Sequence, residues 1–568
     1  MLAAASAAGM SLSACSKGKK PAAEASTQIH QMYELPPFGN VSLFHITDVH
    51  AQLLPTWFRE PNINIGLGSM MGNPPHLVGN NLLKYFNISP NSPEAHALTH
   101  INFVEAAKQY GKVGGFSHLA TLIKSLRQQR KASLLLDGGD NWQGSATSYW
   151  TKGQDMVDAS KLLGVDIMTG HWEFTYGAER VKQIVDNDFK DQVDFLAQNV
   201  FDKDWGDQIF KPYVIKQLNG INVAIIGQAF PYTPIANPLY LVPTWSFGIR
   251  EEELQNNVKK ARKEGAAIVV LLSHNGMDVD LKLASIVSGI DIILGGHTHD
   301  AIPAPVTIKN SSGRTLVFNS GCNGKFLSVL DLDVQNGKLK DFRYKLLPVF
   351  SNFLPADPQM EQLIAKIRKP FESQLNQPLA VTEDLLFRRG NFNGTFDQLI
   401  LDAMLEVQGA EIAFSPGFRW GVSVMPGEII TYEQVLSQTA ITYPTATLNN
   451  LTGERIKEIL EDVADNLFNV DPYKQQGGDM VRVGGLKFSI DPNETIGKRI
   501  ADMELNGKPL QASKEYLVAG WASVQDIPVA KPIWDVVAEY LKSVKTVKAK
   551  ELNLPKIRNM PNNPGIAS

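Results

Sequence analysis

Seven aspartate and histidine residues of this sequence have the types and positions of metal ligands. Each one follows a short apolar run, so we expect it at the end of a buried strand. Two pairs, at 48/50 and 297/299, are separated by a single residue, which places both side chains of a pair on the same side of the chain. The seven residues are Asp48, His50, Asp140, His171, His274, His297 and His299.

This ligand set favours two divalent cations. Carboxylates and imidazoles without thiolate suit Zn, Fe or Mn. Two cations share a bridging anion, for which one carboxylate is sufficient, and they keep a net positive charge that favours a bound hydroxide and an anionic substrate. The alternative is a set of unrelated histidines, each hydrogen-bonded in the core. It explains any single residue well, but not seven residues at five strand ends.

The segments that must position these residues have the pattern of parallel strands. In residues 133–176, the apolar runs 134–136 and 165–168 are separated by an amphipathic segment, which predicts strand, helix and strand. The runs VSLFHI, AAIVVLLS and IDIILGG repeat this pattern before the other ligands. Side chains at the carboxyl ends of parallel strands point into the crevice where open α/β sheets bind ligands. We therefore expect one site at that edge.

Length and composition predict a globular protein with more than one domain. A chain of 568 residues exceeds a single core, and 43% hydrophobic with 20% charged residues is ordinary for a globular protein. The net charge of -4 leaves no basic excess, so we expect no nucleic acid partner. No apolar run has membrane-spanning length, so no transmembrane segment is expected.

We divide the chain by changes in its composition and periodicity. A metal-binding domain is expected over 37–350, with an insertion at 52–111 that is rich in Pro, Asn, His and Gly. A linker helix at 351–380, a second α/β domain at 381–555 and a tail at 556–568 follow.

Residues 1–36 are predicted to be a signal-like or linker segment that does not fold. Leu-Ser-Ala-Cys at 12–15 resembles a lipoprotein cleavage box, in which Cys15 is lipidated. The alternative is an Ala/Ser-rich tail in which Cys15 has no role. No Lys or Arg precedes the apolar stretch, so either the true start lies upstream or the segment is truncated. We expect export to the periplasm.

Five motifs, in chain order, resemble those of the calcineurin-like metallophosphoesterases, specifically the 5'-nucleotidase branch. They are DVH, GD, GHWEF, SHNG and GHTH. NFNGTFDQLILDAML, SPGFRWG and GGLKFSID resemble the C-terminal substrate domain of that branch. The resemblance covers roughly residues 40–555. It implies an N-terminal calcineurin-like α/β sandwich followed by a C-terminal 5'-nucleotidase-type α/β domain.

The resemblance also implies how the seven ligands are shared between two metals. One metal is expected at Asp48, His50, Asp140 and His299. The other is expected at Asp140, His171, His274 and His297, so that Asp140 bridges the two.

The sequence departs from the nucleotidase pattern at the site itself. Nucleotidases have Asn where His171 stands, a catalytic His where Trp172 stands and an Asp partner where Thr175 stands. The aromatic pair that sandwiches the base is not reproduced, because TYPTATLN replaces one segment and Met480 replaces the second aromatic residue. Arg419 in SPGFRWG does match an anion-binding arginine of the family.

This combination, with GHWEFTYG, resembles the SoxB-type thiosulfohydrolases of bacterial thiosulfate oxidation. These enzymes hydrolyse the terminal sulfonate from a cysteine S-thiosulfonate on the SoxYZ carrier protein and release sulfate. The resemblance implies the same activity, SoxYZ as partner, a monomer and two manganese ions, with Zn or Fe as alternatives. It implies catalytic roles for Asp140, His171, Trp172 and Arg419. It implies substrate contacts from Trp172, Arg388, Arg389, Asn391 and Arg419.

Two other functions stay open from sequence. A 5'-nucleotidase or UDP-sugar hydrolase is one, although the missing His–Asp pair and aromatic pair count against it. A non-catalytic, metal-bearing binding protein is the other, although retention of all seven ligands counts against it.

Overall fold

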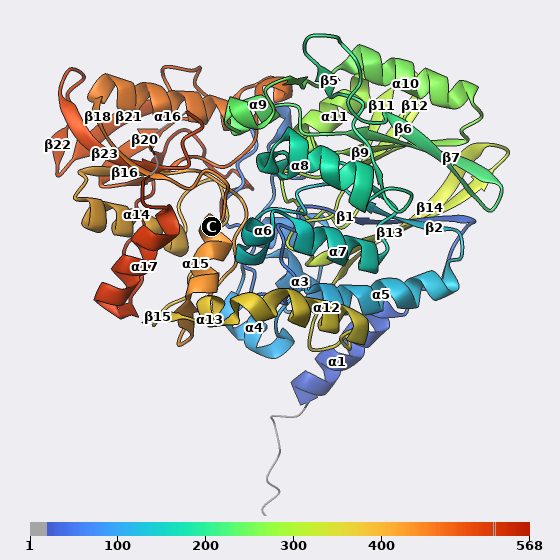
Figure 1. Cartoon of the computed structure of the whole chain (residues 1–568), viewed down its shortest axis with the longest axis horizontal. Coiled ribbons are helices and arrows are strands. Elements are labelled where there is room, and N and C mark those ends of the chain that lie inside the picture. The colour runs from blue at the N-terminus through green and yellow to red at the C-terminus, as the bar shows by residue number, and fades with distance from the viewer. Residues whose placement is uncertain (1–19, 526–527, 529, 568) are drawn as a thin grey trace, which may run out of the picture.

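A computed structural model describes residues 20–525, 528 and 530–567. Figure 1 shows two lobes, one drawn from blue to yellow and the other from orange to red. We call residues 41–348 the N-terminal lobe and residues 378–557 the C-terminal lobe. Both combine helices and sheets, so the predicted α/β class is confirmed.

The N-terminal lobe contains two six-stranded sheets. The first has the order β14 (Lys338–Pro348), β13 (Phe326–Gln335), β1 (Val41–Ile46), β2 (Ser133–Asp137), β3 (Ile167–Met168) and β4 (Asp194–Phe195). In this sheet β1 to β4 are parallel, and β13 and β14 add antiparallel pairs at one edge. The second has the order β11 (Val306–Asn310), β12 (Gly313–Asn319), β10 (Ile292–Gly295), β9 (Ile268–Ser273), β7 (Ile221–Gln228) and β6 (Tyr213–Leu218). In the second sheet the four central strands are parallel and both edge strands are antiparallel. A small pair, β5 (Phe201–Asp202) and β8 (Trp245–Ser246), lies apart from them.

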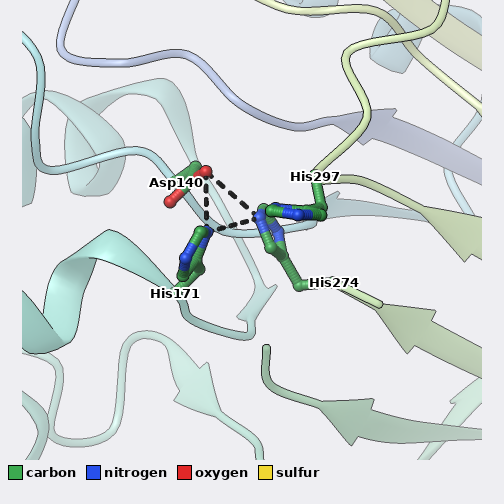
Figure 2. A group of neighbouring side chains, drawn as sticks. All are labelled: Asp140, His171, His274 and His297. Atoms are coloured by element: carbon green, nitrogen blue, oxygen red, sulfur yellow. Dashed lines mark hydrogen bonds and ion pairs between the residues drawn. The ribbon is translucent and has the colours of Figure 1, made fainter. Parts of the chain in front are cut away.

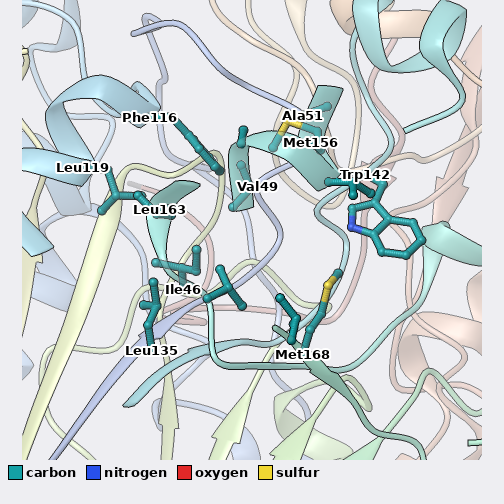
Figure 3. Packing of buried hydrophobic residues seen from close by; sticks show 14 of the residues in the cluster. Ile46, Val49, Ala51, Phe116, Leu119, Leu135, Trp142, Met156, Leu163 and Met168 are labelled. Carbon is teal, nitrogen blue, oxygen red and sulfur yellow. The ribbon is translucent and has the colours of Figure 1, made fainter. Parts of the chain in front are cut away.

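Apolar side chains from the facing strands of both sheets form one core, so the sheets pack as a sandwich. The outer face of the first sheet is covered by α5 (Phe116–Gln129), α7 (Gln154–Leu163) and α12 (Pro358–Arg368). Figure 3 shows this packing, in which Ile46, Leu135 and Met168 lie near Phe116 and Trp142. The outer face of the second sheet is covered by α10 (Glu251–Lys263) and α11 (Met277–Ile286). The central strands, such as β1, β9 and β10, are therefore buried on both faces, which explains their apolar runs.

The C-terminal lobe contains three smaller sheets. Their orders are β17-β15-β24, β18-β23-β16-β19 and β22-β21-β20-β25. The strands are β15 (Pro378–Thr382), β16 (Ile412–Ser415), β17 (Ile429–Thr431), β18 (Ala446–Thr452), β19 (Arg482–Gly484), β20 (Leu486–Ile490), β21 (Ile500–Leu505), β22 (Lys508–Pro509), β23 (Glu515–Trp521), β24 (Thr546–Val547) and β25 (Lys556–Ile557). The helices are α14 (Thr395–Gln408), α15 (Tyr432–Thr439), α16 (Gly453–Phe468) and α17 (Ile533–Val544).

Shorter helices connect these layers. In the N-terminal lobe they are α2 (Gly79–Tyr85), α3 (Pro93–Leu98), α4 (Phe103–Tyr110), α6 (Ala146–Thr151), α8 (Ala178–Gln183) and α9 (Thr233–Ala236), with η1 (Gly68–Met70), η2 (Trp172–Tyr176), η3 (Ile184–Asp188) and η4 (Leu239–Leu241). Between and within the lobes further along the chain are η5 (Lys369–Phe371), α13 (Glu372–Leu375) and η6 (Pro472–Lys474). None of the helices in the described ranges is both long and apolar enough to span a bilayer.

Parts of the predicted N-terminal segment at 1–36 and of the predicted tail at 556–568 form secondary structure. Residues 20–33 form α1 (Lys20–Tyr33), in which Ile29 is fully buried and the Tyr33 hydroxyl donates to the carbonyl oxygen of Pro348 at 2.8 Å. The prediction that this part does not fold is therefore wrong, whereas Cys15 lies outside the described residues. In the expected tail, β25 pairs with β20, and Ile566 forms a bridge with Ile63.

Candidate metal centre

The seven predicted ligands follow five parallel strands of the sandwich. Asp48 and His50 follow β1, while Asp140 and His171 follow β2 and β3 of the same sheet. The second sheet contributes the other three ligands, with His274 directly after β9 and His297 and His299 after β10. Since the carboxyl ends of both sheets converge, the structure brings all seven side chains together.

The ligand atoms form two groups that share Asp140. Within each group the atoms all lie within 4.8 Å of one another. Oδ2 of Asp140 is 3.1 Å from both Nδ1 of His171 and Nε2 of His274, and 3.6 Å from Nε2 of His50. The first two contacts are drawn as dashed lines in Figure 2. The first group is Asp48, His50, Asp140 and His299, and the second is Asp140, His171, His274 and His297.

Hydrogen bonds outside the two groups orient the ligands. Nδ1 of His274 donates to the carbonyl oxygen of Gly138 at 2.6 Å, which leaves the Nε2 lone pair directed toward the centre. Nδ1 of His50 lies 3.2 Å from the carbonyl oxygen of Gln143 and acts in the same way. The Thr47 hydroxyl donates to Oδ2 of Asp48 at 2.6 Å, so that carboxylate is also fixed.

The backbone at these ligands is unusual. Five of the seven have a positive φ, with values from 50° to 75°, in the left-handed region that costs a residue with a side chain roughly 1–2 kcal/mol. Such conformations persist where surrounding structure enforces them, and they concentrate at functional sites. The five are Asp48, His50, Asp140, His297 and His299.

Burial sets the protonation of the imidazoles. It lowers the pKa of His171 and of His299 to about 4 and holds the pKa of His297 well below its ordinary value, so these rings are neutral. For His274, burial also acts to lower the pKa, but the carboxylates of Asp140 and Asp48 outweigh it and raise the pKa to about 10. The neutral imidazoles of His171, His297 and His299 converge with the carboxylates at these distances, and a divalent cation would replace the proton of His274, so the residues fit a dinuclear centre.

Glu173 holds two of the ligand loops together, a role that we did not predict. Its Oε2 accepts hydrogen bonds from the amides of His171 at 2.7 Å and Asp140 at 3.2 Å. Its Oε1 accepts from the amides of Asn141 at 2.7 Å and Trp142 at 3.2 Å. The only signal in the sequence was its place in GHWEF, next to a predicted ligand.

Gly477 is a second residue that the predictions missed. A Cβ atom at this position would lie 1.8 Å from Nε2 of His297, and the glycine has a φ of +81°. Only glycine therefore lets this segment of the C-terminal lobe approach the metal ligands. The Gly-Gly pair in KQQGGDM was the available signal.

A cavity of about 200 Å³ lies between the lobes, and five of the predicted ligands form part of its wall. Trp172 and Phe230 from the N-terminal lobe and Phe418 and Trp420 from the C-terminal lobe form an aromatic wall. Phe418 and Trp420 stack with ring centroids 4.1 Å apart and planes at 21°. Trp172 meets both rings edge-on, at 5.6 and 5.5 Å.

Comparisons with known proteins agree with this geometry. The model of the 5'-nucleotidase C-terminal domain matches residues 380–525. The structure of the sulfate thiohydrolase SoxB from Thermus thermophilus is 36% identical with a TM-score of 0.88, over 93% of this chain and 98% of that one. The chain belongs to the SoxB family. The predicted family resemblance and the two-part α/β fold are thus confirmed.

More distant relatives of this SoxB-family protein are nucleotidases. The 5'-nucleotidase of Bos taurus is 26% identical over 462 residues, which are 72% of this chain and 76% of that protein. A 5'-nucleotidase precursor from Thermus thermophilus has the same fold, with a TM-score of 0.74 at 22% identity over 92% of this chain and 100% of that one. Family membership and the two buried ligand groups together indicate a hydrolase with a dinuclear divalent metal centre.

Arg419 lies in the wall of the cavity and is held by three contacts. Its Nη2 donates to the carbonyl oxygen of Gly478 at 2.6 Å, Nε to Oδ1 of Asp479 at 3.3 Å, and Nη1 to the carbonyl oxygen of His297 at 3.3 Å. The guanidinium therefore joins the segments at 416–420 and 477–479 to the metal-ligand loop.

The other predicted substrate residues of this SoxB-family chain lie elsewhere. Arg388 is buried, with Nε donating to Oδ1 of Asp397 at 2.7 Å, and it is not part of the cavity wall. Its charge is used within the C-terminal lobe, and its contact with substrate stays a prediction. Arg389 and Asn391 line an adjoining, smaller cavity of about 60 Å³, whose wall shares His297, Arg419 and residues 477–479 with the first. The side-chain oxygen of Asn391 accepts from the amide of Ile65 at 2.7 Å.

Proposed function

We propose that this protein is a thiosulfohydrolase that removes the terminal sulfonate from a cysteine S-thiosulfonate on the SoxYZ carrier protein. The observation that carries the proposal is the composition of the cavity. Beyond the five ligands, the charged side chains that line it in the described part of the chain are Arg419 and Asp479, and these two pair with each other. The cavity thus offers an anion clamp but no free general acid.

The chemistry of the leaving group explains why such an acid is dispensable. The oxygen of a water molecule bonds to the sulfonate sulfur, and the sulfur–sulfur bond breaks with its electron pair moving to the cysteine persulfide. Sulfate and one proton are released to solvent when the persulfide becomes protonated. A persulfide is stable as an anion near neutral pH, whereas an alkoxide requires protonation as it departs. The similarity to the sulfate thiohydrolase SoxB of Thermus thermophilus supports this substrate class.

We assign the roles of the residues as follows. Asp48, His50, Asp140 and His299 hold one cation, and Asp140, His171, His274 and His297 hold the other. These cations would supply Lewis acidity and lower the pKa of water. Arg419 presents its guanidinium to the sulfonate oxygens, for which its planar fork is well matched. Manganese is the proposed metal, with Zn or Fe as alternatives, and the protein acts as a periplasmic monomer.

The aromatic wall favours a chain of sulfur atoms as the substrate and disfavours a nucleoside. Phe418 and Trp420 stack on each other at 4.1 Å, which leaves no room for a base between them. The faces and edges of Trp172 and Trp420 instead offer an apolar, polarisable surface to a narrow chain of sulfur atoms.

Parallel steady-state kinetics on one metal-restored preparation test the proposal. We expect sulfate release from thiosulfonate-loaded SoxYZ, and also from a short peptide with the same modified cysteine. Hydrolysis of AMP and UDP-glucose should be slower by about 10²–10⁴, the usual contribution of acid catalysis. Fast AMP turnover without sulfate release would overturn the proposal in favour of a nucleotidase. Elemental analysis of the same sample identifies the metals.

A further inference from the structure

A stretch of the N-terminal lobe beside the cavity is unusually apolar at its surface. Residues 231–244 contain no charged side chain and four prolines. Within this stretch Ile235, Leu239 and Tyr240 are 56%, 63% and 62% exposed. We call these three residues the apolar lip. Surfaces that bind proteins are poor in charge and rich in aromatic side chains at their centres, whereas single exposed apolar residues need no explanation.

The lip is fixed at the entrance to the catalytic cavity by contacts with both lobes. Ala236, at the end of α9, is part of the cavity wall, and its carbonyl oxygen accepts from the hydroxyl of Tyr443 in the C-terminal lobe at 2.7 Å. The Tyr232 hydroxyl donates to the carbonyl oxygen of Tyr473 in the same lobe. On the other side η4 packs against η2, the turn that contains Trp172. Figure 1 shows α9 at the junction of the two lobes.

A further exposed aromatic residue lies in a turn attached to the end of this stretch, between the exposed charged residues Asp204 and Asp207. The backbone amide of Lys203 donates to the carbonyl oxygen of Thr244 at 2.7 Å, which attaches the 202–205 turn to the end of the stretch. Trp205 in that turn is 83% exposed. The four prolines limit the backbone freedom of the stretch, so little entropy is lost when a partner binds it.

The size of the cavity determines what the lip can bind. A volume of about 200 Å³ is smaller than ordinary ligand pockets of roughly 300–1,000 Å³, so it admits only the modified cysteine and its immediate neighbours. If the substrate is attached to a protein, as the proposed function requires, the folded body of that protein must rest outside, next to the entrance. The exposed apolar residues there are Ile235, Leu239 and Tyr240.

We infer that the apolar lip is the docking surface for the folded body of the carrier protein, through an uncharged apolar patch on the carrier. The inference rests on the proposed function for the identity of the carrier. Docking at the lip would place the carrier beside the entrance through which its modified cysteine must reach the cavity. The lip then contributes to recognition of the carrier and not to the chemical step.

The test compares a loaded carrier with a loaded peptide. Tyr240→Glu and Leu239→Glu should each lower kcat/KM for thiosulfonate-loaded SoxYZ about tenfold or more, through KM, because charge in a desolvated contact is costly. Both variants should cleave a pentapeptide bearing the same thiosulfonate at the wild-type rate. The matched control is Tyr85→Glu, a tyrosine of α2 that is 52% exposed, which should leave both substrates unchanged.

Binding of unloaded SoxYZ, measured by biolayer interferometry, separates this inference from the proposed function. Wild-type binding that is lost in Tyr240→Glu supports the lip, even if neither thiosulfonate is hydrolysed and the proposed function fails. Unchanged carrier binding and turnover in both lip variants would overturn the inference. So would an equal loss of activity on carrier and peptide, since the lip would then act on the site itself.

Discussion

The two sides of the catalytic cavity are built differently. On the N-terminal side, ligands extend directly from buried parallel strands, and each lies within a short motif next to an apolar run. On the C-terminal side, Phe418, Arg419 and Trp420 lie in an irregular segment held to residues 477–479. We therefore propose that the first side holds the cations, while the second side selects the substrate that reaches them.

The largest expected effect tests whether Asp140 joins the two metal groups. Asp140→Asn should lose both metals and reduce sulfate release to background, because its Oδ2 faces ligands of both groups. His299→Ala should lose mainly one metal. Metal stoichiometry by mass spectrometry of the purified proteins decides this. Two metals retained in Asp140→Asn would remove the bridging assignment.

Substitution of Gly477 should have a smaller effect, and it tests whether the C-terminal side approaches the metal ligands at this residue. Gly477→Ala should displace His297 and lower the occupancy of one metal, with activity reduced about 100-fold, the upper range for perturbing a ligand's support. Gly507→Ala is the control, because Gly507 also has a positive φ, +72°, but no atom lies within 4 Å of its Cβ position. If Gly477→Ala binds two metals as well as Gly507→Ala does, the approach to His297 does not constrain the metal centre.

Substitution of Glu173 tests whether the ligand loops depend on a carboxylate that does not itself bind metal. Glu173→Gln replaces one acceptor oxygen by a donor and leaves two of four amides without their partner, so metal affinity should fall about 10–100-fold. Competition with a metal chelator measures the change. Glu179→Gln, on the exposed surface of α8, is the matched control. Wild-type affinity in Glu173→Gln would mean that the loops keep their shape unaided.

Two arginines on the C-terminal side should have different roles, one in substrate binding and the other in stability. Arg419→Lys should raise KM for the thiosulfonate roughly tenfold with the melting temperature unchanged, since lysine lacks the planar fork. Arg388→Met should instead lower the free energy of unfolding by about 1.5–3 kcal/mol, because it removes a charged hydrogen bond to the buried Asp397, which keeps Arg482 as its other partner. Steady-state kinetics and thermal denaturation of both variants distinguish the two roles. An unchanged KM in Arg419→Lys would show that this residue is structural.

Trp172 should give the smallest effect, because it contacts both sides without binding metal. Trp172→Ala should lower kcat/KM for the thiosulfonate several-fold, in line with an aromatic contact of about 0.5–1.5 kcal/mol, with two metals retained. Trp172→His should not create AMP hydrolysis, because the hydroxyl of Thr175, 2.6 Å from that of Thr442, stands where a carboxylate partner would be needed. Substantial AMP turnover by Trp172→His would mean that a single missing acid, and not the shape of the cavity, excludes nucleotides.

Local sequence was sufficient to predict each feature that depends on a single strand and the residues directly after it. The apolar runs before Asp140 and His274 predicted buried parallel strands, and the structure contains them as β2 and β9. The packed α1 and β25 were not predicted, because their stability comes from contacts with Pro348 and with β20, which are distant in sequence. Whether a short segment with weak apolar periodicity forms a helix or strand depends on such distant partners.

The sequence by itself determined the types of the seven ligands, their order and the sheets that hold them, because apolar periodicity and ligand chemistry are local properties. Tertiary structure alone decided the left-handed backbone of five ligands and the approach of Gly477 to His297. It also decided that Arg388 is buried against Asp397 while the adjacent Arg389 lines a cavity. Neighbouring side chains in an extended segment point to opposite sides, and only the packing of distant segments determines which side is the site.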